Sequence, residues 1–138
     1  MSLVGLIGGV SPEATKIYYE LLNAHARSRL GGQHSAQCLF YMLDYGVMIG
    51  HYHDENWEAF KAEVVKGALS LKAAGAEAIA ITSGTTHVAA EAVAHETGLP
   101  VIHMLDSLSD AMMAKGVARP LLLGTPWVMS GDFFAPAL

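Results

Sequence analysis

The sequence contains a single cysteine, Cys38, among 138 residues. One thiol cannot form a disulfide within the chain, and it excludes zinc sites built from several cysteines. Chains without disulfides are typical of reducing compartments, so we expect a cytoplasmic protein. Cys38 itself opens the apolar run Cys38-Leu39-Phe40-Tyr41-Met42-Leu43, where we expect a small buried residue without a catalytic role.

Positive charge is also scarce, because 8 Lys+Arg stand against 13 Asp+Glu, for a net charge of −5. This balance provides no basic field for a polyphosphate backbone, and we expect no nucleic-acid partner. Long apolar runs are missing as well, since Lys72 and Glu77 interrupt the most apolar stretch, residues 68–81. A membrane span needs about 20 apolar residues, so no membrane partner is expected. The N-terminus lacks the basic region of a signal peptide.

Hydrophobic residues make up 52% of the chain and charged residues 15%, a balance typical of a chain with a sizeable core. Apolar runs of strand length alternate with stretches whose apolar residues recur at helical spacing. Strands are predicted at residues 3–7, 38–43, 78–81 and 101–104, and helices at 12–30, 57–74, 88–97 and 107–115. Residues 47–55 fit neither pattern. The alternation predicts an α/β fold, with a parallel sheet flanked by helices.

The end of the chain repeats its beginning. The run Pro120-Leu121-Leu122-Leu123-Gly124-Thr125 predicts a fifth strand similar to the first, and a further helix is predicted from Asp132. We therefore expect a first α/β domain at residues 1–118 and the beginning of a second, incomplete α/β domain at 119–138. A strand without its covering helix exposes an apolar face, which favours a homo-oligomer. The alternative is a final edge strand with a frayed tail.

Ligands of parallel sheets bind beyond the carboxyl ends of the strands. Four loops are expected at this edge: Gly8-Gly9-Val10-Ser11, Asp44-Tyr45-Gly46, residues 82–86 and Gly124-Thr125. The first and third carry glycines, hydroxyls and helix N–H groups, which suit a small carboxylate or phosphate. The alternative for the first loop is a tight turn with Ser11 as N-cap and Pro12 at the first helical position.

Other chemistries find less support. Gly5-x-x-Gly8-Gly9 differs from the GxGxxG fingerprint, no GxxxxGK[ST] motif occurs, and Ser83 lacks the glycine of a nucleophile elbow. The run His51-Tyr52-His53-Asp54 contains metal-ligand residue types, but a solvated loop is favoured and no metal is expected. His87 follows the third loop, where it could orient a loop carbonyl or a substrate; a helix-capping histidine would look the same.

Two motifs are fairly specific, Gly8-Gly9-Val10-Ser11-Pro12-Glu13 and Gly31-Gly32-Gln33-His34-Ser35. Weaker matches continue at Asp44-Tyr45, Trp57-Glu58, residues 82–87, Pro100-Val101-Ile102-His103 and Leu123-Gly124-Thr125. Together they resemble the cofactor-independent aspartate/glutamate racemases. The resemblance implies two similar α/β halves with the active site between them, and this chain looks like the first half followed by the beginning of the second.

The resemblance also implies a reaction without pyridoxal phosphate or metal, so no cofactor is expected. In the family, one cysteine from each half flanks the substrate α-carbon, where one thiolate removes a proton and the opposite thiol delivers another. Thr82 stands at the first cysteine's position and is the predicted catalytic residue; the second cysteine would lie beyond Leu138. Gly84 replaces an asparagine of the family motif. The predicted substrate-binding residues are Val10, Ser11, Ser83, Gly84, Thr85 and Thr125.

The leading hypothesis is a racemase-like isomerase that acts on a small acidic amino acid or dicarboxylate, with activity impaired in this short chain. One alternative is a non-catalytic domain that binds small carboxylates or serves assembly. Another is a related reaction such as decarboxylation in the same cleft. Exchange of the α-proton separates the first hypothesis from the second, and a substrate panel separates it from the third.

Overall fold

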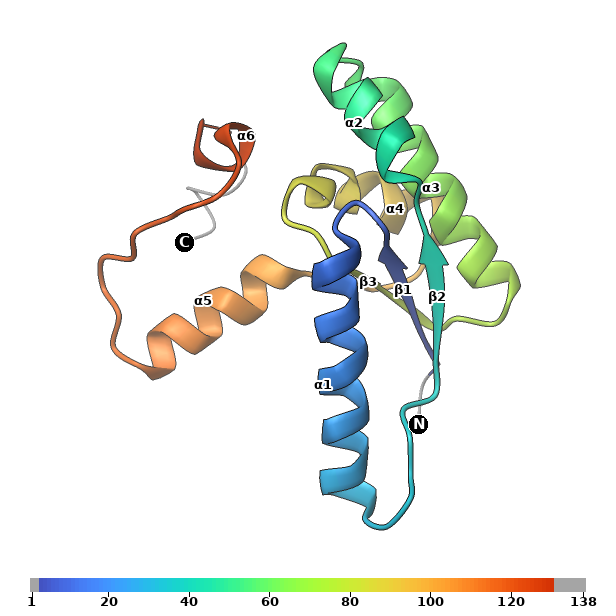
Figure 1. Cartoon of the computed structure of the whole chain (residues 1–138), viewed down its shortest axis with the longest axis vertical. Helices are drawn as coiled ribbons and strands as arrows, with labels where there is room; N and C mark the ends of the chain where they lie inside the picture. The colour runs from blue at the N-terminus through green and yellow to red at the C-terminus, as the bar shows by residue number, and fades with distance from the viewer. Residues whose placement is uncertain (1–2, 131–138) are drawn as a thin grey trace.

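The computed structural model describes residues 3–130. Four parallel strands form one sheet in the order β2(Cys38–Met42), β1(Val4–Gly8), β3(Ala78–Ile81) and β4(Val101–Ile102). β1 is central, since Val4 aligns with Cys38 on one side and with Ala78 on the other. Helices flank the sheet (Figure 1), which confirms the predicted α/β class.

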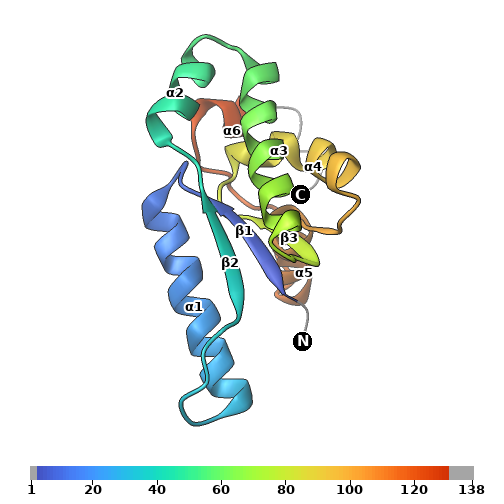
Figure 2. The ribbon, with the colours of Figure 1, turned by 90° about the vertical axis from the view of Figure 1, so that its right-hand side faces the viewer.

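Helices cover both faces of the sheet. Figure 2 shows α1(Pro12–Leu30) on one side, and α3(Trp57–Ala73) and α4(Ala90–Thr97) on the other. The alternation of β1 explains this arrangement, because Gly5 faces Leu71 of α3 whereas Gly8 faces Thr15 of α1. A Cβ atom at either glycine would crowd the facing helix, so both helices approach the strand closely.

The core lies between the sheet and α3 with α4. Its most deeply buried side chains include Ile7, Phe60, Val64, Ile79 and Val93, each at most 1% exposed. Burying a side chain of this size contributes about 1.5–3 kcal/mol. These contacts fix the ends of β1 and β3, from which the site loops emerge.

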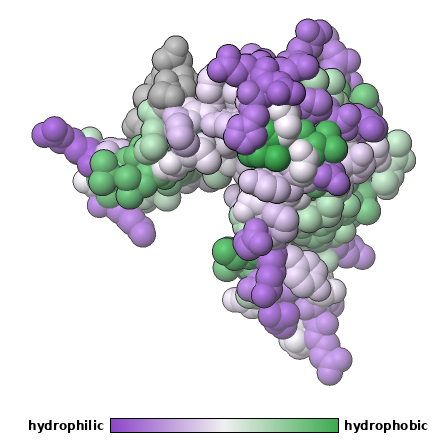
Figure 3. Space-filling model, turned by 45° about the horizontal axis from the view of Figure 1, so that its top comes forward, coloured by the Kyte–Doolittle hydropathy of each residue, from purple (hydrophilic) through white to green (hydrophobic). Residues whose placement is uncertain are grey.

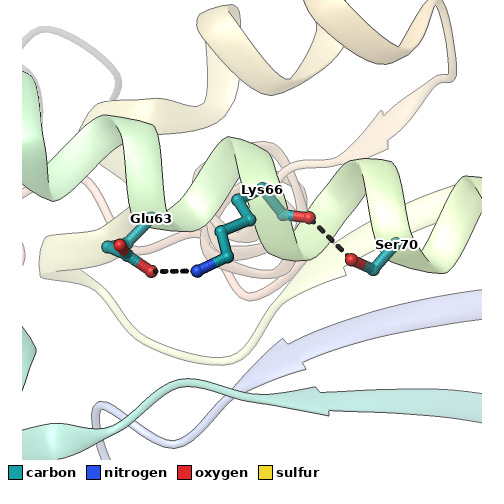
Figure 4. Close-up of polar contacts among 3 residues, drawn as sticks. All are labelled: Glu63, Lys66 and Ser70. Carbon is teal, nitrogen blue, oxygen red and sulfur yellow. Dashed lines mark hydrogen bonds and ion pairs between the residues drawn. The ribbon is translucent and has the colours of Figure 1, made fainter.

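Lys66 and Ser70 lie on the exposed side of α3, and Figure 4 shows the polar contacts that they make. Lys66 Nζ lies 3.5 Å from Glu63 Oε2, and the Ser70 hydroxyl donates to the Lys66 carbonyl at 2.9 Å. An exposed ion pair of this kind contributes at most about 1 kcal/mol. α3 is therefore held by its apolar side.

The turn from β1 into α1 follows the sequence prediction. The Ala14 N–H donates to the Ser11 hydroxyl at 3.2 Å, and Pro12 occupies the first helical position. Gly9 adopts φ +98°, and a Cβ atom there would collide with the backbone of Leu43. Glycine is thus required where the β1 and β2 loops touch.

Several boundaries differ from the prediction. The undecided segment forms α2(Tyr45–His53), capped by the Asp44 side chain, which accepts from the Val47 N–H at 3.1 Å. A 3₁₀ turn, η1(Thr85–Ala89), precedes α4. β4 has only two residues, because His103 caps α5(Met104–Ala114) and starts that helix three residues early.

The predicted fifth strand at residues 120–125 is wrong. Within residues 3–130 this segment pairs with no strand, and α6(Pro126–Ser130) follows it. A strand needs a neighbouring edge, but Figure 1 shows α5 and the segment after it leading away from the sheet. The helix predicted from Asp132 lies outside the described residues.

We call residues 104–130 the arm. Figure 3 shows apolar side chains gathered over α5 and the segment that follows it. Met113, Leu121 and Leu123 are 70%, 82% and 77% exposed. Apolar surface of this kind is typical of a face that another surface covers. None of the helices within residues 3–130 has the length and apolarity to cross a membrane.

Candidate functional site

A cavity of about 310 Å³ opens where the loops after β1 and β3 meet the arm. Its lining residues are Val10, Ser11, Tyr45, Ile49, Tyr52, Phe60, Ser83, Thr85, Thr125 and Pro126. Five of the six predicted substrate-binding residues, from three separate segments, are among them. The parallel sheet brings the first two segments together, since both follow carboxyl ends of neighbouring strands.

The sixth, Gly84, lines a neighbouring cavity of about 300 Å³. Ser83, Thr85 and Thr125 line both cavities. The hydroxyl oxygens of Thr85 and Thr125 lie 3.4 Å apart and connect η1 with the arm. The Thr125 hydroxyl also accepts from the Val128 N–H at 3.3 Å, so one side chain both caps α6 and faces the cavities.

Thr82, the predicted catalytic residue, directly follows β3 and is only 3% exposed. Its hydroxyl lies 3.1 Å from the Ile7 carbonyl oxygen and 3.0 Å from the Thr15 hydroxyl. The Thr15 hydroxyl in turn accepts from the Gly9 N–H at 3.3 Å. Thr82 is not among the residues that line the two cavities. The structure thus places it behind the loops, in a hydrogen-bond network that joins β1, β3 and α1.

His87 contacts backbone at both ring nitrogens. Nδ1 lies 2.8 Å from the Ser83 carbonyl oxygen, and Nε2 accepts from the Met104 N–H at 3.1 Å. An acceptor Nε2 requires the proton on Nδ1, which donates to Ser83, so the ring is neutral. Both sequence interpretations fit this geometry, since the ring holds the Ser83 carbonyl and also accepts from the first residue of α5.

The surroundings of His87 favour the neutral ring. Burial lowers the pKa of His87 below 6.5, the hydrogen bond to Ser83 opposes this shift, and the nearby His103 adds to the lowering. The two imidazole rings meet edge to face with centroids 4.6 Å apart. His87 thereby ties the Ser83 loop to the start of α5 at neutral pH.

Sequence reasoning missed the aromatic wall of the first cavity. Tyr45, Ile49 and Tyr52 come from α2 and Phe60 from α3. The signal available was Asp44, a good N-cap residue directly before this apolar stretch. With α2 in place, the cavity has hydroxyls on one side and aromatic rings on the other.

The described lining of the two cavities carries little positive charge. None of the described residues that line them is a lysine, arginine or histidine. A carboxylate bound here would rely on hydroxyl and backbone donors and on the positive N-terminus of α1, where Ser11 lies.

Metal ligands do not cluster at the site. His51 and His53 lie in the last turn of α2, and residues 3–130 contain no group of three side chains suited to a metal ion. Cys38 is half-buried, and burial raises the pKa of its thiol. As the first residue of β2 it lies at the amino edge of the sheet, opposite the cavities.

Comparisons with known proteins agree with this architecture. The profile of the Asp/Glu/Hydantoin racemase family matches residues 7–138. A candidate Asp/Glu racemase from Yersinia pestis superposes with a TM-score of 0.90 at 34% identity, over 97% of this chain and 58% of that one. An aspartate racemase homologue from Pyrococcus horikoshii OT3 gives a TM-score of 0.85 at 30% identity, with the same coverage.

The aspartate racemase of Picrophilus torridus shares the fold, with a TM-score of 0.77 at 22% identity over 99% of this chain. The chain spans 58% of the length of each of these three proteins. Because the family profile covers nearly all of the chain and two of the structures are at least 30% identical to it, the chain belongs to the Asp/Glu/Hydantoin racemase family.

Proposed function

We propose that this chain forms one wall of a racemase site for a small acidic amino acid or related dicarboxylate. The observation that carries the proposal is the shared cavity, which joins Val10, Ser11, Ser83, Thr85 and Thr125 in a chain of the racemase family. Hydroxyl donors on one side suit a carboxylate, and aromatic side chains on the other side limit the access of water.

The reaction we propose is α-proton transfer without a cofactor. The C–H bond breaks as a base accepts the proton, the electron pair delocalises into the carboxylate, and an acid on the opposite face returns a proton. Thr82 occupies the family position of the first base. Its hydroxyl is already engaged with Ile7 and Thr15, so we assign it a positioning role or that of a weak donor.

Little racemisation is expected from the 138-residue chain by itself. Its single thiol, Cys38, lies at the opposite edge of the sheet, and loss of one positioned acid or base costs a factor of about 10²–10⁴. We therefore keep a second candidate function, binding of small carboxylates without turnover, which the engaged hydroxyl of Thr82 favours.

We further propose that residues 1–118 form the first domain and 119–138 begin a second one. The exposed Leu121 and Leu123 favour a covering surface from a homo-oligomer. We also propose a cytoplasmic location, which the single cysteine favours.

The test is a pair of measurements on the purified chain. Titration with L- and D-aspartate and glutamate, followed by NMR, should shift the amide resonances of Ser11, Ser83 and Thr85. Incubation in D₂O should show loss of the substrate α-proton at or slightly above the no-protein control. Ser83→Ala with Thr85→Val should abolish the shifts, whereas Ser70→Ala on the exposed side of α3 should preserve them. Absence of binding to the folded wild-type chain contradicts the proposal.

A further inference from the structure

The arm reaches the cavity from far along the sequence. Thr125 and Pro126 line the cavity beside residues of α2, α3 and η1. Val128, the buried residue of α6, packs with Met104, Leu105 and Leu122, which belong to the arm itself. That packing holds α6 against the rest of the arm but does not orient α6 relative to α3.

An aromatic stack makes the connection to α3. The rings of Trp57 and Trp127 lie with centroids 4.1 Å apart and an interplanar angle of 23°. Trp57 also contacts Tyr52 at 5.7 Å and Phe60 at 5.5 Å between centroids. Both of these line the cavity, so Trp127 stacks on the residue that supports its aromatic wall.

The stack rests on ring contact. The Trp127 indole nitrogen is buried and has no hydrogen-bond partner in the described structure. A buried donor without a partner opposes docking, and stacking together with burial of the ring must exceed that cost. A substitution that replaces the flat ring of Trp127 by a non-aromatic side chain would therefore release α6 from α3.

Trp127 follows Thr125 by two residues at the start of α6. The backbone of this turn is closed by the Met129 N–H, which donates to the Thr125 carbonyl at 3.0 Å, and by the Val128 N–H on the Thr125 hydroxyl. Fixing the Trp127 ring thus fixes Thr125, whose hydroxyl lies 3.4 Å from that of Thr85.

We infer that Trp127 is a positioning residue for this site: by stacking on Trp57 it holds Thr125 beside Thr85 and sets the arm's side of the cavity. The inference rests on the proposed function where it concerns substrate, and on geometry alone where it concerns Thr125. The sequence has two tryptophans, Trp57 and Trp127, so the indole signals of both residues report on the contact between them.

The test compares Trp127→Leu with Trp127→Phe, which keeps a flat ring, and with Met129→Leu, an exposed change in the same helix. Trp127→Leu should move the amide resonances of Thr85 and Thr125 and weaken aspartate binding about three- to tenfold, the range of one aromatic pair. Trp127→Phe should stay within about twofold of wild type, and Met129→Leu should change neither readout.

A ligand-free measurement covers the case in which Trp127→Leu does not fold. Nuclear Overhauser contacts between the two indoles, and between the Thr85 and Thr125 methyls, should be present in the wild-type chain, and their absence overturns the inference. Unchanged resonances and affinity in folded Trp127→Leu overturn it as well. If the wild-type chain binds no aspartate or glutamate, the proposed function fails, while displaced Thr85 and Thr125 resonances in Trp127→Leu still support the positioning role.

Discussion

The hydroxyl oxygens of Thr15 and Thr82 lie 3.0 Å apart and join α1 to the residue that follows β3, beneath the site loops. Each hydroxyl has one proton, and backbone oxygens of Ser11 and Ile7 lie within 3.1 Å as further acceptors. The pair therefore serves as a buried link between two segments that are 67 residues apart.

Removing one member of this pair should destabilise the chain. We expect Thr15→Val to lower the free energy of unfolding by about 1–3 kcal/mol, because the Gly9 N–H and the Thr82 hydroxyl lose a partner in a buried place. Urea unfolding followed by circular dichroism measures the change. Thr15→Ser, which keeps the hydroxyl, should cost less; equal losses would show that the methyl group and not the hydroxyl matters.

Thr82→Cys tests whether substrate reaches the buried position that follows β3, and under the proposed function it should raise α-proton exchange. A cysteine thiol has an ordinary pKa near 8.5, far closer to neutrality than an alcohol, so it supplies a better base at the family position. The measurement is loss of the aspartate α-proton signal in D₂O, relative to the Thr82 chain. Thr97→Cys places a thiol at another buried threonine, in α4, and should leave exchange at background. A folded Thr82→Cys chain without increased exchange would argue that this position does not face substrate.

Gly9→Ala should destabilise the loop between β1 and α1. The left-handed φ of +98° and the collision with the Leu43 backbone both oppose a side chain, so we expect a loss above about 1 kcal/mol. Gly50→Ala is the matched control, since it lies in α2 with open space around it and should gain about 0.4–1 kcal/mol. Thermal unfolding of both variants gives the comparison, and a neutral Gly9→Ala would contradict the structure of this turn.

Acid should weaken the fold through His87. Burial holds the pKa of His87 below the value of 6.5 expected in the unfolded chain. The unfolded chain therefore binds more protons as pH falls below 6.5, and the free energy of unfolding decreases until the folded ring also protonates. Above about pH 7, His87 is neutral in the folded and the unfolded chain, and its full contribution to the free energy of unfolding is present.

Chemical denaturation from pH 8 to pH 5 measures this effect. His87→Gln should flatten the dependence, whereas His53→Gln, at an exposed position, should retain the wild-type slope. Identical profiles in all three chains would exclude His87 as the group responsible.

The sequence predicted which loops meet at the carboxyl edge of the sheet better than it predicted the course of the arm. Glycines and hydroxyls after β1 and β3 have a local cause, since tight turns and helix caps demand these residues at fixed positions. Their convergence follows from the parallel sheet, which the strand and helix alternation already indicated. Val10, Ser11, Ser83 and Thr85 therefore meet as expected.

The errors arise where the outcome depends on distant partners. Leu121, Leu122 and Leu123 form an apolar run that suits a strand, yet the choice of strand depends on an available edge, which the sequence does not encode locally. α2 was missed because its apolar residues are spread around the helix and give no periodic face. The stack of Trp57 on Trp127 joins residues 70 positions apart, and no local pattern predicts it.

The central position of β1 also has a consequence for synthesis on the ribosome. β1 is translated before the other three strands of the sheet, and its second neighbour, β3, begins 74 positions later. At about 5–20 residues per second, roughly 4–15 s pass before that neighbour exists. During this interval the apolar β1 can pair only with β2, so the nascent chain exposes an unpaired edge next to Leu6 and Ile7. Folding of this protein is thus expected to await translation of β3, and the nascent chain before that point is the species most exposed to aggregation.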